Sequence, residues 1–116
     1  MLTTHSLIEL LRATPEQVEF TQTISTIEQE YTFAPAKFVN GSQVNEAGEN
    51  NGSCKIFAFA MLNELSQQET LHLFGDYYRK DVLEHPLAED HQNIRQFIKC
   101  GWESVKFDTI ALTPKS

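Results

Sequence analysis

A run of seven apolar residues, Ile56–Leu62 (IFAFAML), constrains the fold more than any other segment. Phe57 and Phe59 stand two positions apart, so a helix would point their rings about 200° apart. Both rings can be buried only if other elements surround that helix. The run is far shorter than the ~20 residues that span a bilayer. We therefore predict a buried central helix from Ser53, as its N-cap, to Leu65.

Further helices are predicted on both sides of this segment, because apolar residues recur there at three- and four-residue spacing. Turn and capping residues set their limits: Thr14 and Pro15 open the second helix, Ser66 with Glu69 forms a capping box, and Gly101 ends the last helix. The expected helical segments are 7–13, 15–31, 66–85 with a bend at Gly75, and 90–101 with Asp90 as its N-cap.

Two segments are expected to be extended. Thr32–Val39 is rich in aromatic and β-branched residues, and Pro35 confines it to a sheet edge. Ser104–Leu112 has the pattern of one or two short strands, and Asn40–Ser53, rich in Asn and Gly, is expected to be a long loop. The prediction is one mostly helical α+β domain over residues 1–116, with a small antiparallel sheet joining the two extended segments.

The composition excludes several functional classes. The formal charge of −7 gives the chain no general attraction to a phosphate backbone or an anionic bilayer, so we expect neither nucleic acid nor membrane as a partner. The two cysteines, Cys54 and Cys100, form no CxxC motif and fit a reducing compartment. The N-terminus lacks the basic region and cleavage site of a secretory signal. We expect a protein that is soluble.

No metal or cofactor is expected. Glu69 and His72 have the ExxH spacing of di-iron bundles, but such a site needs two of these motifs, and Glu69 is already explained as part of a capping box. His85 and His91 stand six positions apart across Pro86, which is not a recognised zinc spacing.

Cys54 is the one candidate nucleophile. It precedes Lys55 at a predicted helix N-terminus, where the helix dipole and the ammonium group would both lower a thiol pKa. His91 is the candidate base, if it lies within hydrogen-bond reach. The structural alternative is a small buried cysteine in the core.

A second hypothesis is an anion site at two helix N-termini, the one after Ser53 and the one after Asp90. Both are surrounded by polar residues, and we expect them to meet on one concave surface with Arg95 or Lys55 supplying positive charge. Tyr77 and Tyr78, upstream of Asp90, and Trp102, downstream of it, would supply the aromatic walls of such a pocket. The candidate ligand-binding residues are Asn40, Gly41, Asn51, Ser53, Lys55, Tyr78, Arg79, His91, Asn93, Arg95 and Trp102.

Several blocks of sequence resemble the HopJ type III effector family of bacteria. These are NGSCKIFAFA from Asn51, FGDYYRKDVLEHP from Phe74 and DHQNIRQFIKCGW from Asp90, together with FVNG and VKF. The resemblance covers about Phe33–Leu112, and it carries over the candidate residues above and Cys54 without assigning them roles. One departure is Leu87–Ala88, where the family pattern has a glycine in the turn.

The resemblance implies a bacterial protein of the cytoplasm, delivered by a type III apparatus if the family name applies; Thr3, Thr4 and Ser6 would then belong to an uncleaved signal. No catalytic mechanism is implied. Two hypotheses stay open. The preferred one is a non-enzymatic binding or effector module for a small anionic ligand or a protein partner. The alternative is a small hydrolase or transferase that uses Cys54 and His91.

Overall fold

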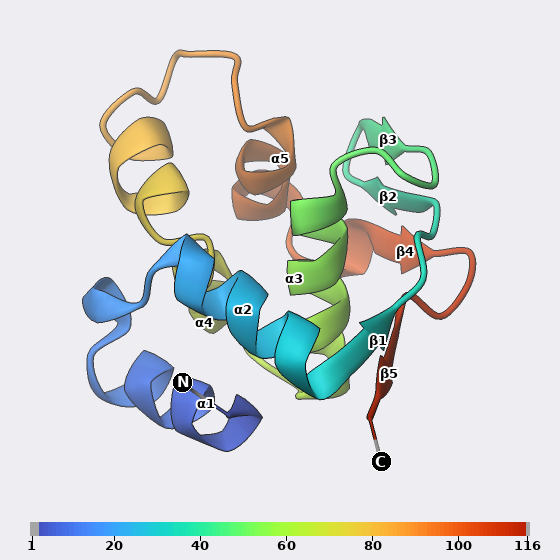
Figure 1. Cartoon of the computed structure of the whole chain (residues 1–116). Coiled ribbons are helices and arrows are strands. Elements are labelled where there is room, and N and C mark those ends of the chain that lie inside the picture. The colour runs from blue at the N-terminus through green and yellow to red at the C-terminus, as the bar shows by residue number, and fades with distance from the viewer. Residues whose placement is uncertain (1–2, 116) are drawn as a thin grey trace.

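Helix α3 (Asn51–Leu62) runs through the middle of the computed structural model, and the other elements surround it (Figure 1). The structure describes residues 3–115. Its other elements, in chain order, are α1 (Thr4–Ala13), η1 (Pro15–Gln17), α2 (Phe20–Glu30), β1 (Tyr31–Phe33), β2 (Phe38–Asn40), β3 (Gln43–Asn45), α4 (Gln67–His72), η2 (Tyr77–Val82), α5 (Gln92–Cys100), η3 (Trp102–Ser104), β4 (Val105–Phe107) and β5 (Leu112–Pro114).

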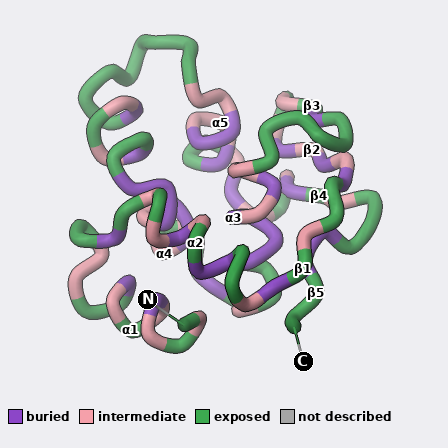
Figure 2. Tube along the Cα trace, viewed as in Figure 1, coloured by how far each residue is buried: buried purple, intermediate pink, exposed green. Residues whose placement is uncertain are grey.

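The core is built on the two opposed faces of α3. Phe57 and Phe59 are both 0% exposed, as the predicted central helix requires, and Figure 2 shows the buried stretch of α3 inside the molecule. The Phe57 ring lies 5.0 Å from that of Phe97 and 5.6 Å from that of Phe74. On the other face, the Phe59 ring meets Tyr31 edge to face at 5.6 Å. The prediction of a buried central helix is confirmed.

The limits of α3 differ from the predicted ones. The helix begins at Asn51, with Asn50 as its N-cap residue, instead of being capped by Ser53. It ends at Leu62 instead of Leu65, because Asn63 is the C-cap and Glu64 turns the chain with a φ of 52°.

The strands form two antiparallel sheets where one was predicted. β1 pairs with β5, while β2 lies between β3 and β4. The two segments predicted to pair do pair, with Phe33 opposite Leu112 and Phe38 opposite Phe107. The stretch of chain that contains Pro35 belongs to neither sheet, which divides the predicted strand in two. The predicted loop also contains β3, joined to β2 by a turn in which Gly41 has a φ of 60°.

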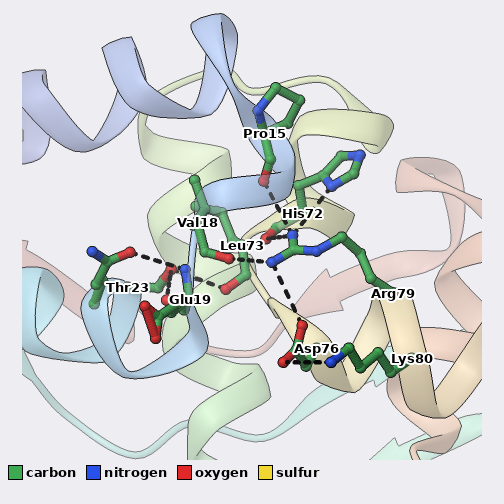
Figure 3. A network of polar contacts seen from close by, with 10 residues as sticks. Pro15, Val18, Glu19, Thr23, His72, Leu73, Asp76, Arg79 and Lys80 are labelled. Atoms are coloured by element: carbon green, nitrogen blue, oxygen red, sulfur yellow. Dashed lines mark hydrogen bonds and ion pairs between the residues drawn. The ribbon is translucent and has the colours of Figure 1, made fainter.

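The predicted helix from Pro15 to Tyr31 is wrong in its continuity. A 3-10 turn, η1, is followed by extended backbone at Val18, where φ is −75° and ψ is 129°, before α2 begins. The guanidinium of Arg79 holds this break, donating to the carbonyl oxygens of Pro15 at 3.1 Å and of Val18 (Figure 3). Since Arg79 lies more than 60 positions further along the chain, local spacing could not predict the break.

The predicted helix 66–85 is divided in the structure, because α4 ends at His72 and η2 begins at Tyr77. The capping box at Ser66 is confirmed: its hydroxyl accepts from the Glu69 N–H at 3.1 Å, and its own N–H donates to the Glu69 carboxylate at 2.9 Å. Gly75 turns the chain with a φ of 61°. The single π-helical turn η2 ends at Val82, ahead of Pro86. The molecule is therefore a mostly helical α+β domain. Among residues 3–115, no helix has the length and apolar character needed to cross a membrane.

Truncating Phe57 to alanine should lower the free energy of unfolding by about 3–5 kcal/mol, because the removed ring leaves a cavity at the centre of the core. Phe59→Ala should have a similar effect on the other face of α3. Leu87, which is 95% exposed, gives the control, and Leu87→Ala should change stability by less than about 0.5 kcal/mol. Urea denaturation measures all three. A loss below about 1 kcal/mol for both phenylalanines would contradict a central α3.

Candidate functional site

A cleft of about 370 Å³ opens between the N-terminal ends of α3 and α5. One part of its lining is polar and the other is aromatic or aliphatic. The lining residues are Phe20, Gln43, Asn50, Gly52, Ser53, Phe74, Tyr77, His91, Gln92, Asn93 and Ile94. The two helix N-termini that were predicted to share a concave surface therefore do share one.

Three aromatic rings form one side of the cleft. Phe20, at the start of α2, meets Tyr77 edge to face at 4.9 Å, and Tyr77 lies 5.1 Å from the ring of His91. Two glycines let Phe20 approach closely. A Cβ at Gly52 would lie 3.1 Å from Cζ of Phe20, and one at Gly75 would lie 2.6 Å from its backbone nitrogen. Larger residues at these positions would displace the aromatic wall.

The two helix ends at the cleft share an unusual backbone. Asn50 precedes α3 with φ 51° and ψ 49°, and His91 precedes α5 with φ 52° and ψ 48°. This left-handed conformation is uncommon for residues other than glycine. Neither residue caps its helix with its side chain. Ser53 and Asp90, which were predicted to be the caps, both lie one or more positions away from the cap and do not serve as one.

Because the side-chain caps are missing, the first N–H groups of both helices are left without partners. A helix leaves its first N–H groups without intrahelical acceptors, and a capping side chain normally satisfies one or two of them. Here five amide groups have no hydrogen-bond acceptor among residues 3–115: those of Asn51, Gly52, Ser53, Gln92 and Asn93. Two helix ends with positive dipole charge and available donors thus face one cleft.

His91 and Arg95 contact two carboxylates beside the cleft, those of Asp81 and Asp90. His91 Nε2 lies 3.0 Å from Asp81 Oδ2 and 3.8 Å from Asp90 Oδ2. Arg95 donates to the Asp90 carboxylate at 2.7 Å, and this bond holds the pKa of that carboxyl below its ordinary value of 3.8. Arg95 also donates to the carbonyl oxygen of His85 at 2.9 Å. The loop that precedes α5 is therefore fastened to that helix.

Four asparagines form a hydrogen-bonded cluster at the polar side of the cleft. Asn40, Asn45 and Asn93 are 6% exposed or less, and their carboxamides bond to one another or to backbone. Asn50 donates to Asn45 Oδ1 at 2.7 Å. Oδ1 of Asn40 is the one buried side-chain oxygen or nitrogen in the described part of the chain that has no partner. The cluster joins β2 and β3 to the starts of α3 and α5.

Comparison with known proteins places this fold in a family. A family model described as HopJ type III effector protein matches residues 4–112. The chain belongs to this family. The match extends N-terminally beyond the Phe33–Leu112 stretch that carries the recognised motifs. The chain is also similar to a crystal structure described as that of unknown function protein VPA0580. The two share 52% sequence identity and a TM-score of 0.95, and the similarity covers 96% of this chain and 92% of that one. No curated protein matches the chain.

The structure brings only some of the HopJ motif residues to the cleft. Ser53, His91 and Asn93 line it, and Asn51 contributes the start of α3 beside it. Lys55 and Arg95, which were expected to supply positive charge, do not line the cleft. Lys55 pairs instead with Glu28 at 3.0 Å. Any positive potential in the cleft must therefore come from the helix ends.

Other motif residues hold the scaffold. Tyr78 is buried, and its hydroxyl accepts from Gln68 at 3.1 Å. Arg79 fixes the break before α2, as described above. Trp102 donates from Nε1 to the carbonyl oxygen of Leu65 at 3.1 Å. Gly41 makes the β2–β3 turn, and a Cβ there would lie 2.4 Å from Oε1 of Gln96. Ligand binding by these four residues stays a prediction without a cleft to support it.

Sequence reasoning missed several lining residues and the residue behind them. Phe20, Phe74 and Tyr77 line the cleft but are not among the predicted ligand-binding residues. Asn45 and Asn50 were missed because their roles depend on contacts between β3 and two helix ends. The signal available in the sequence was the density of asparagines between Asn40 and Asn51.

Cys54 lies in the core and not in the cleft. It is 1% exposed, and its thiol donates to the carbonyl oxygen of Ala36 at 3.7 Å. Burial raises its pKa above the ordinary value of 9.0, outweighing the influence of Lys55. The reactive thiolate is therefore disfavoured near neutral pH. These features argue against the alternative in which His91 activates Cys54. Within residues 3–115, no group of three or more His, Cys, Asp or Glu side chains could hold a metal ion.

Iodoacetamide should distinguish the two cysteines in the native protein. We expect Cys100, which is partly exposed, to be alkylated at pH 7.5 while Cys54 reacts only after unfolding. The physical reason is that Cys54 is both inaccessible and protonated. Peptide mass spectrometry after timed labelling measures both rates. Faster labelling of Cys54 than of Cys100 would restore it as a candidate nucleophile.

Proposed function

We propose that this HopJ-family protein is a non-enzymatic binding module whose cleft takes a small carboxylate with an apolar, ring-bearing body. The observation that carries the proposal is that two helix ends with five unpartnered backbone N–H groups, four of them on residues that line the cleft, meet at a cleft with an aromatic side. Helix N-termini bind carboxylates and phosphates through such N–H groups and the positive end of the dipole. The aromatic side would receive the rest of the ligand.

The net charge of the chain does not oppose this assignment. His91, which lines the cleft, contacts the carboxylates of Asp81 and Asp90, and Asp90 is also paired with Arg95. More distant acidic side chains are screened over about 10 Å at 0.1 M salt. The helix-end donors act at hydrogen-bond range, where screening is least effective. A local anion site is therefore compatible with an acidic protein.

The size and mixed character of the cleft favour a small ligand over a phosphate ion. Its volume of about 370 Å³ lies within the range of small-molecule pockets. Phe20, Phe74 and Tyr77 offer ring contacts that an inorganic ion would not use. Ser53 also lines the cleft, and its hydroxyl has no hydrogen-bond partner within the described residues. An aromatic carboxylate would use both sides.

Benzoate and benzamide provide the test, because they share a ring and differ in charge. Titrating benzoate into the ¹⁵N-labelled protein should shift the amide resonances of both helix ends saturably, whereas benzamide should bind at least about tenfold more weakly. Inorganic phosphate should bind more weakly than benzoate. Equal binding of benzoate and benzamide, or no shift at either helix end, would overturn the proposal.

Tyr77→Ala tests the aromatic side. Tyr77 is 42% exposed, so its removal should not unfold the protein, yet benzoate affinity should fall about two- to tenfold through lost ring contacts. Leu83→Ala is the matched control, since Leu83 is 53% exposed on the following turn and does not line the cleft. If both variants bind benzoate like the parent, the ring wall has no part in binding.

Family membership also supports delivery through a type III secretion apparatus, which we propose as the cellular context of the module. Thr3 and Ser6, considered as part of a signal, form the capping box of α1, with the Ser6 N–H donating to Thr3 Oγ1 at 3.1 Å. A reporter fused after this helix should be secreted by bacteria with a working type III apparatus and retained by an apparatus mutant. Retention in both strains would contradict the proposal.

A further inference from the structure

Asn45 lies behind the cleft and bonds to both of its helix ends. The residue is on β3, is 0% exposed and does not line the cleft. Its Oδ1 accepts from Asn50 Nδ2 at 2.7 Å and from Asn93 Nδ2 at 2.9 Å. Asn50 immediately precedes α3, and Asn93 lies in the first turn of α5. One carboxamide oxygen therefore joins the two helix starts.

The second half of the Asn45 carboxamide completes the attachment. Its Nδ2 donates to Asn93 Oδ1 at 3.1 Å and to the carbonyl oxygen of Phe38 at 3.3 Å. Asn45 and Asn93 thus form a reciprocal pair, each donating to the other. Only a carboxamide offers a donor and an acceptor in this arrangement. The bond to Phe38 anchors the pair to β2, so the sheet fixes the position of both helix ends.

We propose that Asn45 is a positioning residue that holds the N-termini of α3 and α5 at a fixed separation, so that their amides bind one carboxylate together. The inference rests on the proposed function. Buried polar networks in which the groups are paired are rigid, and rigidity at a binding site reduces the ordering cost of association. Without Asn45 the two helix ends would become independent, and a carboxylate would meet one of them at a time.

The left-handed backbone at the two helix starts makes such a restraint necessary. Asn50 and His91 have positive φ values although neither is a glycine, the residue that adopts this conformation without steric cost. These conformations persist only where surrounding contacts fix them. Asn45 supplies such a contact directly to Asn50. At the α5 start, the contact is with Asn93, two positions after His91.

Benzoate titration of the ¹⁵N-labelled protein tests the inference by comparing two sets of amides. In the parent, resonances of Gly52 and Ser53 at α3 and of Gln92 and Asn93 at α5 should follow one common dissociation constant. In Asn45→Ala, benzoate affinity should fall about tenfold or more, and the two sets should no longer share a dissociation constant. This loss of a common constant is a readout that general destabilisation would not produce.

Asn63→Ala is the matched control. Asn63 caps the opposite end of α3 and donates to the Tyr31 hydroxyl at 3.1 Å and to the Phe59 carbonyl oxygen at 2.8 Å. Its loss should destabilise the fold while leaving benzoate affinity and the common constant unchanged. Titrations are run well below the melting temperature of each variant. If Asn45→Ala binds benzoate as Asn63→Ala does, the inference is overturned.

Asn50→Gly keeps the inference testable if Asn45→Ala does not fold. Glycine accepts the left-handed backbone at this position, so the substitution removes the bond to Asn45 without adding strain. The α3 amides should then lose most of their response while the α5 amides keep a weakened one. Parent-like affinity with one common constant would overturn the inference. Absence of benzoate shifts in the parent would overturn the proposed function itself, and so separates the two failures.

Discussion

Burial of both faces of α3 is the constraint on which the rest of the structure depends. Phe57 and Phe59 require packing partners on opposite sides of the helix, and their ring partners come from β1, β2, α5 and the turn after α4. A helix surrounded in this way has only its ends left for polar chemistry. The N-terminal end of α3 lies beside the start of α5, so the position of the cleft follows from the packing of the core around α3. Phe74 packs on Phe57 and also lines the cleft, so a different partner for Phe57 would move one wall of the cleft.

The HopJ motif residues divide into a small group at the cleft and a larger group that holds backbone. Arg79, Arg95, Trp102 and Asn40 each donate to main-chain carbonyl oxygens that come from other segments. Buried carbonyl groups outside regular structure need such donors. The motif is therefore informative about how the loops are fixed, and the proposed binding rests on backbone N–H groups, which every residue except proline provides.

This division explains what could be predicted from sequence. The apolar run of α3, the Ser66 capping box and the extended backbone within the two paired segments depend on local pattern, and the structure has them. The break at Val18 depends on Arg79, and the cap positions at Asn50 and His91 depend on Asn45 and Asp81. Those contacts join residues distant in sequence. That the two helix ends would meet was inferable from their polar flanks, but the identity of the donors was not.

The pairing of the strands has a consequence for the order in which the chain folds. β1 pairs with β5, and β2 pairs with β4, so neither sheet can be completed before the last quarter of the sequence is available. During synthesis, α1, α2 and the apolar α3 are complete while these strands are still missing. Long-range pairing of this kind slows folding and leaves apolar surface exposed until it is made. The nascent protein therefore has an interval in which Phe38 lacks the stacked ring of Phe107, and this interval ends when β4 pairs with β2.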